Sequence, residues 1–124
     1  MDAEIPYVHL SLRNNILIGT YRKNLHIDLH VAREIVRIRL SFTHGKIYPS
    51  LILSKGIISI DKPAREYLAS KEAIEGLLAS AIVVESTYSS FLGNFFLAVN
   101  KTKLPVKIFT DESLAEKWLQ QFIV

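Results

Sequence analysis

The 124-residue sequence contains no cysteine. Disulfide bonds, thiol nucleophiles and cysteine-based zinc sites are therefore excluded, and the composition fits a reducing compartment. Long apolar runs are missing as well, because the richest one, Phe91–Val99, is too short to span a bilayer. The first residues carry neither the basic nor the apolar region of a signal peptide. We therefore expect a cytoplasmic protein without a membrane span.

Sequence motifs for catalysis are also missing. There is no Ser-His-Asp spacing, no His-Glu-x-x-His, no Gly-x-Ser-x-Gly and no glycine-rich phosphate loop. The net charge of +3, from 15 basic and 12 acidic residues, is too small to indicate nucleic-acid binding. The basic pairs Arg37 with Arg39 and Lys101 with Lys103 have no interleaved aromatic residues. We expect no nucleic-acid partner, no cofactor and no catalytic residue.

What the sequence does contain is enough apolar residues for one core. Hydrophobic residues make up 49% of the chain and charged residues 22%, so we expect one ordered domain over residues 1–124. The mean hydropathy of +0.22 is high for a domain this small. The surplus apolar surface would suit a self-association face or an apolar pocket.

The first third of the chain predicts a hairpin followed by a helix. Residues Tyr7–Arg13 alternate between apolar and polar, Ile16–Tyr21 are rich in strand formers, and Asn14-Asn15 joins them. Asparagine tolerates the positive φ of a tight turn, which indicates a β-hairpin. A helical period then starts at Asp28 and runs to about Thr43, with Gly45 as its expected C-cap.

After the hairpin, strands and helices alternate. Continuous apolar runs, typical of strands buried on both faces, lie within residues 46–54, 80–85 and 106–109. The intervening patterns predict helices from Asp61 to Leu78, in one piece or two, and from Thr87 to Asn100, with a last helix capped by Thr110. The order β-β-α-β-α-β-α-β-α predicts an α/β fold with a mixed sheet whose later strands are parallel. The last helix is expected to pack through Leu114, Ala115, Trp118, Leu119 and Phe122.

This order resembles that of SpoIIAA-like domains, the group that includes the STAS anti-sigma-factor antagonists and is related in shape to Sec14-type lipid-binding domains. The most similar segments are Tyr48–Leu53, Ala81–Val84 and Val106–Glu112, the last continuing to Ala115 and Trp118-Leu119. That last segment looks like the closing strand and helix of uncharacterised bacterial SpoIIAA-like proteins. The resemblance implies a bacterial protein with this fold and a regulatory or protein-interaction role.

The chain departs from the antagonists at their phosphorylation site. They carry a phosphorylatable serine directly after an aspartate, where a helix follows the third strand. Asp61 matches the aspartate, but Lys62 and Pro63 follow it, so the hydroxyl is absent. A phosphate at a helix N-terminus acts as an electrostatic switch. Ser59 is a poor substitute because it is expected in extended chain, so the sequence indicates a module without the usual phospho-switch.

One polar run is a candidate ligand site. Ser86, Thr87, Tyr88 and Ser89 follow a buried strand and precede a helix. Ligands of open α/β sheets bind at the carboxyl ends of strands, and helix-start N–H groups with several hydroxyls suit an anion. The favoured interpretation is simpler: Ser86 or Thr87 caps the helix and the other side chains are solvated.

The helix after this run is apolar nearly all round, which is typical of a helix buried on more than one side. Phe91, Phe95 and Phe96 lie in it. Packing against the sheet is the default for such a helix. Its second side suits a homodimer face or an apolar ligand pocket, in which Tyr67 is also expected.

A metal site is the third alternative. His26, Asp28 and His30 would share one face of a strand, and imidazole and carboxylate are reasonable zinc or nickel ligands. The favoured interpretation is that Asp28 caps the helix, so the three side chains diverge. Three functions therefore remain: a non-catalytic interaction module forming a homodimer, a Sec14-like binder of an apolar or amphipathic small molecule, and, least favoured, a metal-dependent activity.

Overall fold

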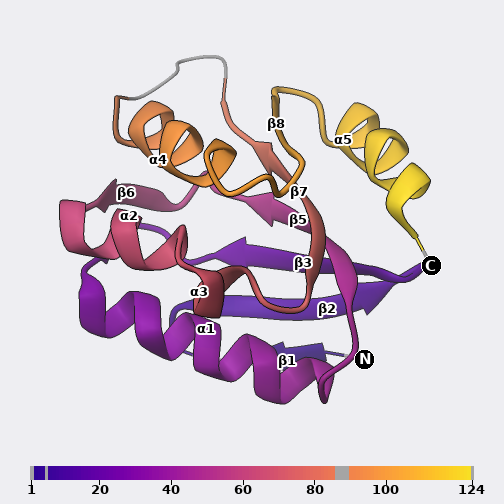
Figure 1. The fold of residues 1–124 in the computed structure, drawn as a ribbon, viewed down its shortest axis with the longest axis horizontal. Coiled ribbons are helices and arrows are strands. Elements are labelled where there is room, and N and C mark those ends of the chain that lie inside the picture. Colours follow the sequence, from indigo (N-terminus) through magenta and orange to yellow (C-terminus); the bar gives the residue numbers. More distant parts are fainter. Residues whose placement is uncertain (1, 5, 86–89, 124) are drawn as a thin grey trace.

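The computed structural model describes residues 2–4, 6–85 and 90–123. A six-stranded sheet in the order β1-β2-β3-β5-β7-β8 forms its centre (Figure 1). The strands are β1 (Asp2–Glu4), β2 (Val8–Arg13), β3 (Ile16–Tyr21), β4 (Leu25–Ile27), β5 (Tyr48–Leu53), β6 (Ile57–Ile60), β7 (Leu77–Val83) and β8 (Val106–Phe109). The helices are α1 (Leu29–Thr43), α2 (Lys62–Leu68), α3 (Lys71–Ile74), α4 (Ser90–Asn100) and α5 (Glu112–Leu119), followed by a 3-10 helix at Gln120–Phe122.

The sheet is mixed, as the sequence predicts. Strands β1, β2 and β3 pair antiparallel, whereas β3, β5, β7 and β8 pair parallel. The predicted hairpin is confirmed, because Arg13 pairs with Ile16 and both turn residues have positive φ, 54° at Asn14 and 62° at Asn15. Two positive φ angles are the signature of a type I′ turn, which matches the twist of the flanking strands.

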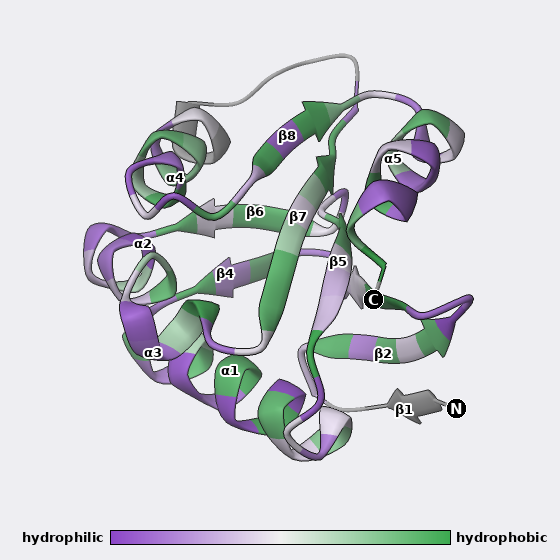
Figure 2. Ribbon diagram, turned by 45° about the vertical axis from the view of Figure 1, so that its right-hand side comes forward, coloured by the Kyte–Doolittle hydropathy of each residue, from purple (hydrophilic) through white to green (hydrophobic). Residues whose placement is uncertain are grey.

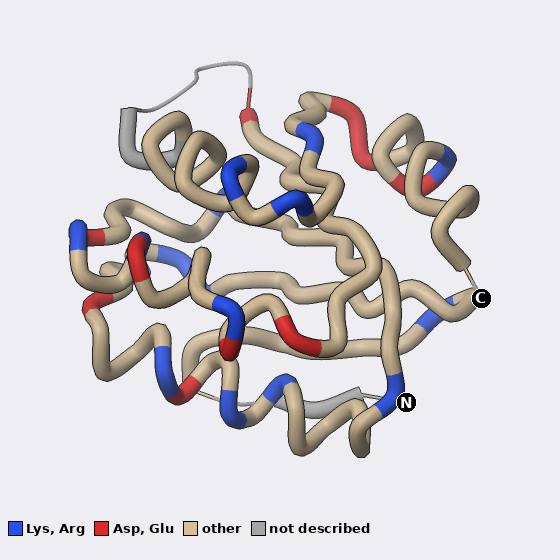
Figure 3. The backbone as a smooth tube through the Cα atoms, viewed as in Figure 1, with Lys and Arg blue, Asp and Glu red and all other residues tan. Residues whose placement is uncertain are grey.

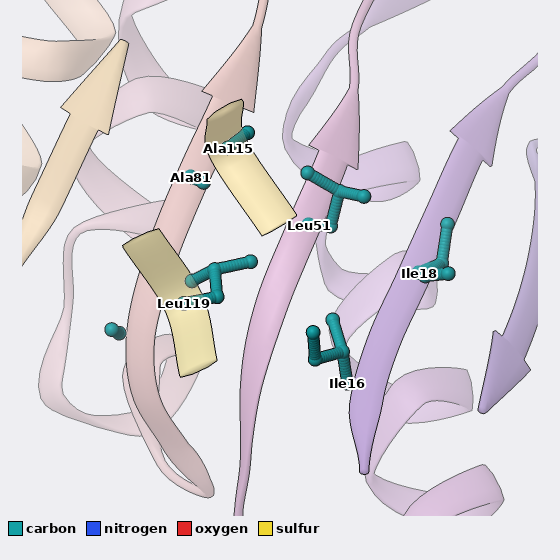
Figure 4. Packing of buried hydrophobic residues seen from close by; sticks show 7 residues of the cluster. Ile16, Ile18, Leu51, Ala81, Ala115 and Leu119 are labelled. Carbon is teal, nitrogen blue, oxygen red and sulfur yellow. The ribbon is translucent and has the colours of Figure 1, made fainter. Parts of the chain in front are cut away.

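The two faces of the sheet are covered unequally. Side chains alternate along a strand, so Ile16 and Ile18 of β3 lie on the face opposite Leu17. On the first face, α5 places Ala115 and Leu119 over the strands (Figure 4). Helices α1, α2 and α4 pack against the clusters of the other face. Figure 2 shows that β7 and β8 between these layers are largely hydrophobic.

Aspartate residues start three of the helices. The carboxylate of Asp28 accepts from the N–H of Val31 at 2.8 Å, that of Asp61 from Ala64 at 3.0 Å, and that of Asp111 from Leu114 at 3.0 Å. Each bond satisfies a helix-start N–H group that has no partner within the helix. The predicted caps at Asp28 and Asp61 are confirmed. The prediction that Thr110 caps the last helix is wrong, because Asp111 is the N-cap of α5.

Three further expectations need correction. His44, with a φ of 51°, takes the C-cap of α1 that we expected at Gly45, and Gly45 follows it in the left-handed region as well. Leu114 is 58% exposed and does not join the core side of α5. Of the two alternatives for residues 61–78, the structure has two helices, α2 and α3, with Ser70 as the N-cap of the second, but the expected end at Leu78 is wrong because α3 ends at Ile74 and β7 begins at Leu77.

The sequence analysis also missed a second, two-stranded sheet. Strand β4 pairs parallel with β6, and their side chains Ile27 and Ile60 are buried against α1 and α2. This sheet requires a close approach at Gly56, where an added Cβ would overlap the carbonyl oxygen of Arg22 and lie 2.6 Å from that of Tyr21. Only glycine leaves room for this approach of two backbones.

Charged residues lie mostly on helices and connecting segments, with both signs interspersed along the backbone (Figure 3). Among residues 2–4, 6–85 and 90–123, no helix is long and apolar enough to cross a membrane.

Replacing Gly56 by alanine should lower the free energy of unfolding by about 3 kcal/mol, because the overlapping atoms are backbone and have little freedom to shift. Gly45→Ala is the control: a Cβ there meets nothing within 4 Å, so only its φ of 77° opposes the substitution, at about 1 kcal/mol. Urea unfolding of both variants measures the difference. Equal losses would contradict the close approach at Gly56.

Candidate functional site

A cavity of about 90 Å³ lies between the sheet and helices α1, α3 and α4, and we call it the sheet–helix cavity. Its floor includes four small residues, Gly19 of β3, Ser50 of β5, Ser80 of β7 and Ser54 just after β5, which lie among larger apolar strand residues: Leu10, Leu17, Ile52, Leu77, Ile82 and Val106. Strands of a parallel sheet covered on both faces usually carry Val, Ile or Leu at such positions. The small side chains leave the space beneath the helices unfilled.

The walls of the cavity are apolar and come from several elements. Helix α1 contributes Ile35 and Val36, α3 contributes Ile74, and α4 contributes Phe95 and Val99. The structure thus places Phe95 inward, in contact with the clusters around Ile60 and Ile82. Tyr67, which we expected in such a pocket, is not among the lining residues; its neighbour Leu68 is.

The serine hydroxyls of the floor are already engaged in hydrogen bonds. The Oγ atoms of Ser50 and Ser80, paired across β5 and β7, lie 3.2 Å apart. The hydroxyl of Ser54 donates to the carbonyl oxygen of Val83 at 2.8 Å. Satisfied hydroxyls are compatible with a largely apolar surface. The floor therefore offers shape more than polar recognition.

Arg39 is the cation of the cavity lining. It lies on α1, and its Nη2 donates to the carbonyl oxygens of Ala73 at 2.8 Å and Glu75 at 2.7 Å, which ties α1 to the end of α3. A guanidinium has five N–H groups. Within the described part of the chain, Nε and Nη1 donate to no residue. Burial lowers the pKa of Arg39, although Tyr21, Tyr67 and Glu75 act in the opposite direction, and the group stays charged.

Tyr21 contributes a second polar group to the lining. It ends β3 and lines the cavity, and its hydroxyl forms no hydrogen bond to any described residue. Burial raises its pKa above the ordinary value of 10.0, and the nearby Arg39 opposes this. Buried hydroxyls are nearly always hydrogen-bonded, so this one is available to a bound water or ligand.

The chemistry of the lining favours binding over catalysis. Arg39 and Tyr21 are the titratable side chains among the lining residues. Neither has a pKa near neutrality, and a general base or acid needs one. An apolar wall with a cation and a hydroxyl can instead hold and orient an amphipathic molecule.

A second, open depression of about 630 Å³ lies at the carboxyl ends of the parallel strands, and we call it the strand-end groove. Its lining includes charges of both signs, Lys23 and Lys55 against Glu85 and Glu112. The predicted ligand residues Ser86, Thr87, Tyr88 and Ser89 lie outside the described residues, directly after Glu85. The groove follows the rule that ligands bind at strand ends, but its lining side chains are mostly exposed.

The structure separates the residues of the predicted metal group. His26 is exposed on β4 and its Nδ1 lies 2.7 Å from the Oγ of Ser59, Asp28 caps α1, and His30 is exposed in the first turn of α1. Over the described part of the chain, no three His, Cys, Asp or Glu side chains form a possible metal group.

At the position that matches the phospho-switch of the antagonists, Asp61 caps the start of α2. Lys62, which stands in place of the serine, is exposed, and its Nζ lies 4.0 Å from the Oε1 of Glu66.

Of the three phenylalanines proposed for an interface or pocket, Phe95 lines the cavity and Phe96 is half-buried, while the side chain of Phe91 lies outside the described residues.

Two lining residues, Tyr21 and Arg39, were not predicted from the sequence as site residues. A signal for Arg39 was present, because it follows the buried Ile35 by four residues and so shares its helix face. A positively charged residue on the apolar face of a helix is a sign of a binding site, because the charge lies where the helix packs against the core.

The raised pKa of Tyr21 predicts a loss of stability in alkali. The folded state holds the phenolic proton more tightly, so this contribution is complete below pH 10 and is lost as the pH rises through the folded pKa. Urea unfolding at about pH 9 and about pH 11 should show a smaller decline in Tyr21→Phe than in the unaltered protein. Tyr67→Phe is the comparison. Burial also raises the pKa of this more exposed tyrosine, so its replacement should change the decline in the same direction. An identical decline in Tyr21→Phe and unaltered protein would contradict the buried hydroxyl.

Comparison with known proteins supports the fold. Among curated proteins no match is found. The solved structure of an uncharacterized protein of the DUF3478 family with a SpoIIAA-like fold, from Shewanella loihica PV-4, aligns with a TM-score of 0.66 at 16% identity, covering 96% of this chain and 98% of that one. The fold is therefore SpoIIAA-like, as the resemblance implied. Because the model of the family described as Domain of unknown function (DUF7793) matches residues 10–123, the chain belongs to that family.

Proposed function

We propose that this chain is a non-catalytic regulatory module of STAS-like type that binds a small, largely apolar molecule in the sheet–helix cavity. The observation that carries the proposal is the open space above three small residues on neighbouring central strands, Gly19, Ser50 and Ser80, beneath apolar helix side chains. Large branched residues would fill this space and stabilise the core. Leaving it open sacrifices stability, which a bound molecule restores by mass action.

Ligand binding also supplies the input that the phospho-switch supplies in related modules. At the matching position the Asp61 carboxylate already binds the helix-start N–H of Ala64, and Lys62 carries no hydroxyl. The cavity touches α1, α3 and α4, so its occupant contacts most of the helical layer. Filling the cavity would therefore favour one arrangement of these helices and so change the surface that a partner meets.

The size of the cavity limits the ligand. Pockets for drug-sized molecules measure roughly 300–1,000 Å³. An engineered apolar cavity of about 150 Å³ accommodates benzene. The sheet–helix cavity, at about 90 Å³, suits a ligand smaller than these.

A cavity-filling variant tests the proposal. Replacing Ser50 and Ser80 together by valine removes both members of a hydrogen-bonded pair, so the fold should lose little stability while four methyl groups take the place of two hydroxyls in the floor. In NMR titrations, 1-butanol should shift the amide signals of lining residues in the unaltered protein and fail to do so in the double variant. Ser11→Val, on the opposite face of β2, is the matched control and should bind like the unaltered protein. Equal shifts in all three proteins, or none in any, would sink the proposal.

A second candidate function, a homodimeric interaction module, draws support from α4. Leu97 is 60% exposed on this helix, whereas Phe95, two residues earlier, points into the core. An exposed large apolar side chain beside further apolar residues suits a contact with a second copy of the chain.

Leu97→Glu should convert such a dimer to a monomer, because a carboxylate at the interface would be buried without a partner. The matched control is Leu114→Glu on α5, where the leucine is 58% exposed and away from α4. Native mass spectrometry over a concentration series reads out the oligomeric state. A protein that stays monomeric at every concentration, or a dimer that tolerates Leu97→Glu, would remove this candidate.

A further inference from the structure

We infer that the molecule bound in the sheet–helix cavity is a short-chain carboxylic acid, whose carboxylate meets Arg39 and Tyr21. This inference rests on the proposed function, since it names the ligand class of the same cavity. It follows from the charge, the free hydrogen-bonding groups and the size of the site.

Arg39 brings a positive charge to the cavity lining. The residue is half-buried, and a cation that is partly removed from water is stabilised by an anionic partner. Arg39 binds backbone carbonyl oxygens, and no carboxylate of the described residues forms an ion pair with it. The ligand is therefore the missing anion.

The acidic side chains near Arg39 are used elsewhere or lie in solvent. Glu34 binds Arg37 at 2.8 Å, and Glu72 accepts from the hydroxyl of Tyr67 at 3.0 Å. The backbone carbonyl oxygen of Glu75 accepts a hydrogen bond from Arg39, and the residue itself is exposed. Glu75 acts on the charge of Arg39 without an ion pair and from outside the lining, so no carboxylate of the described residues lies in the cavity itself.

The hydrogen-bonding groups are complementary to a carboxylate. The two bonds to Ala73 and Glu75 both leave from Nη2, so Nε and Nη1 of Arg39 still have N–H groups to donate. The Tyr21 hydroxyl stays protonated, since burial raises its pKa, and it has no other partner in the described chain. A carboxylate accepts several such bonds with two oxygens.

One positive charge balances one negative charge. A phosphate monoester brings nearly two negative charges and a larger head group, and the lining has a single cation with which to meet them. A carboxylate brings one charge. In proportion to the six-carbon ligand of a cavity of roughly 150 Å³, a space of about 90 Å³ accommodates about three to four carbons, which matches the three-carbon alkyl chain of butanoate with its carboxylate against Arg39 and Tyr21.

Butanoate and butanamide are the decisive probes, because they share size and shape and differ in charge. NMR titration of the unaltered protein at neutral pH and constant ionic strength gives both dissociation constants. Butanoate should bind at least about tenfold more tightly, since hydrogen bonds to a charged group are stronger than those between neutral groups.

Variants locate the effect. Arg39→Gln should abolish the preference for the acid, and Tyr21→Phe should weaken butanoate binding at least about tenfold, in line with the loss of one hydrogen bond to a charged group. Arg37→Gln, exposed on the same helix and paired with Glu34, is the matched control and should leave both dissociation constants unchanged. Because Arg39 also ties α1 to α3, Tyr21→Phe keeps the test valid if Arg39→Gln fails to fold.

The outcomes separate the two levels of the argument. If butanamide binds as tightly as butanoate, the cavity binds ligands but the inferred carboxylate is wrong. If neither probe nor 1-butanol binds, the proposed function itself is wrong. If butanoate binds with the expected preference and Arg37→Gln weakens it as much as Arg39→Gln does, the anion lies elsewhere and the inferred site is wrong.

Discussion

On the face of the sheet covered by α1, α2 and α4, three small residues at the centre leave space beneath the helices, although larger apolar residues surround them. Gly19, Ser50 and Ser80 occupy the centre of that face, where branched residues would give a solid core. The opposite face shows the contrast, since Ile18 and Leu51 pack there directly against Ala115 and Leu119 (Figure 4). One sheet thus has a filled side that holds the fold together and an underfilled side that is free for binding.

Polar side chains in this protein also divide into those that hold the fold together and those that are free for binding. Most acidic residues with a defined role are structural: Asp28, Asp61 and Asp111 bind helix-start N–H groups. Arg39 has a structural role through Nη2 and leaves the rest of its guanidinium without a described partner. A single side chain therefore holds two helices in place and adds a positive charge to an apolar cavity.

The sequence predicted the elements that carry a period and a cap, and it failed where neither exists. The Asn14-Asn15 hairpin, α1 and the strand at Val106–Phe109 follow from alternation, helical spacing and turn residues. Strand β4 has three residues, too few for a pattern, and its pairing with β6 depends on the tertiary approach at Gly56. The cavity could not be predicted, because it arises from which helix covers which small strand residue. Arg39 was visible only as a cation out of place in an apolar stripe.

The order of the strands has a consequence for how the chain reaches this fold. Along the large sheet, β1, β2, β3, β5, β7 and β8 lie in the order in which they occur in the sequence. Each strand that leaves the ribosome therefore finds its neighbour already made, and no later strand has to insert between two earlier ones. Each new strand pairs with the strand made just before it in the sheet, so synthesis and assembly proceed in the same direction, and β8, the last strand made, remains at one edge of the finished sheet.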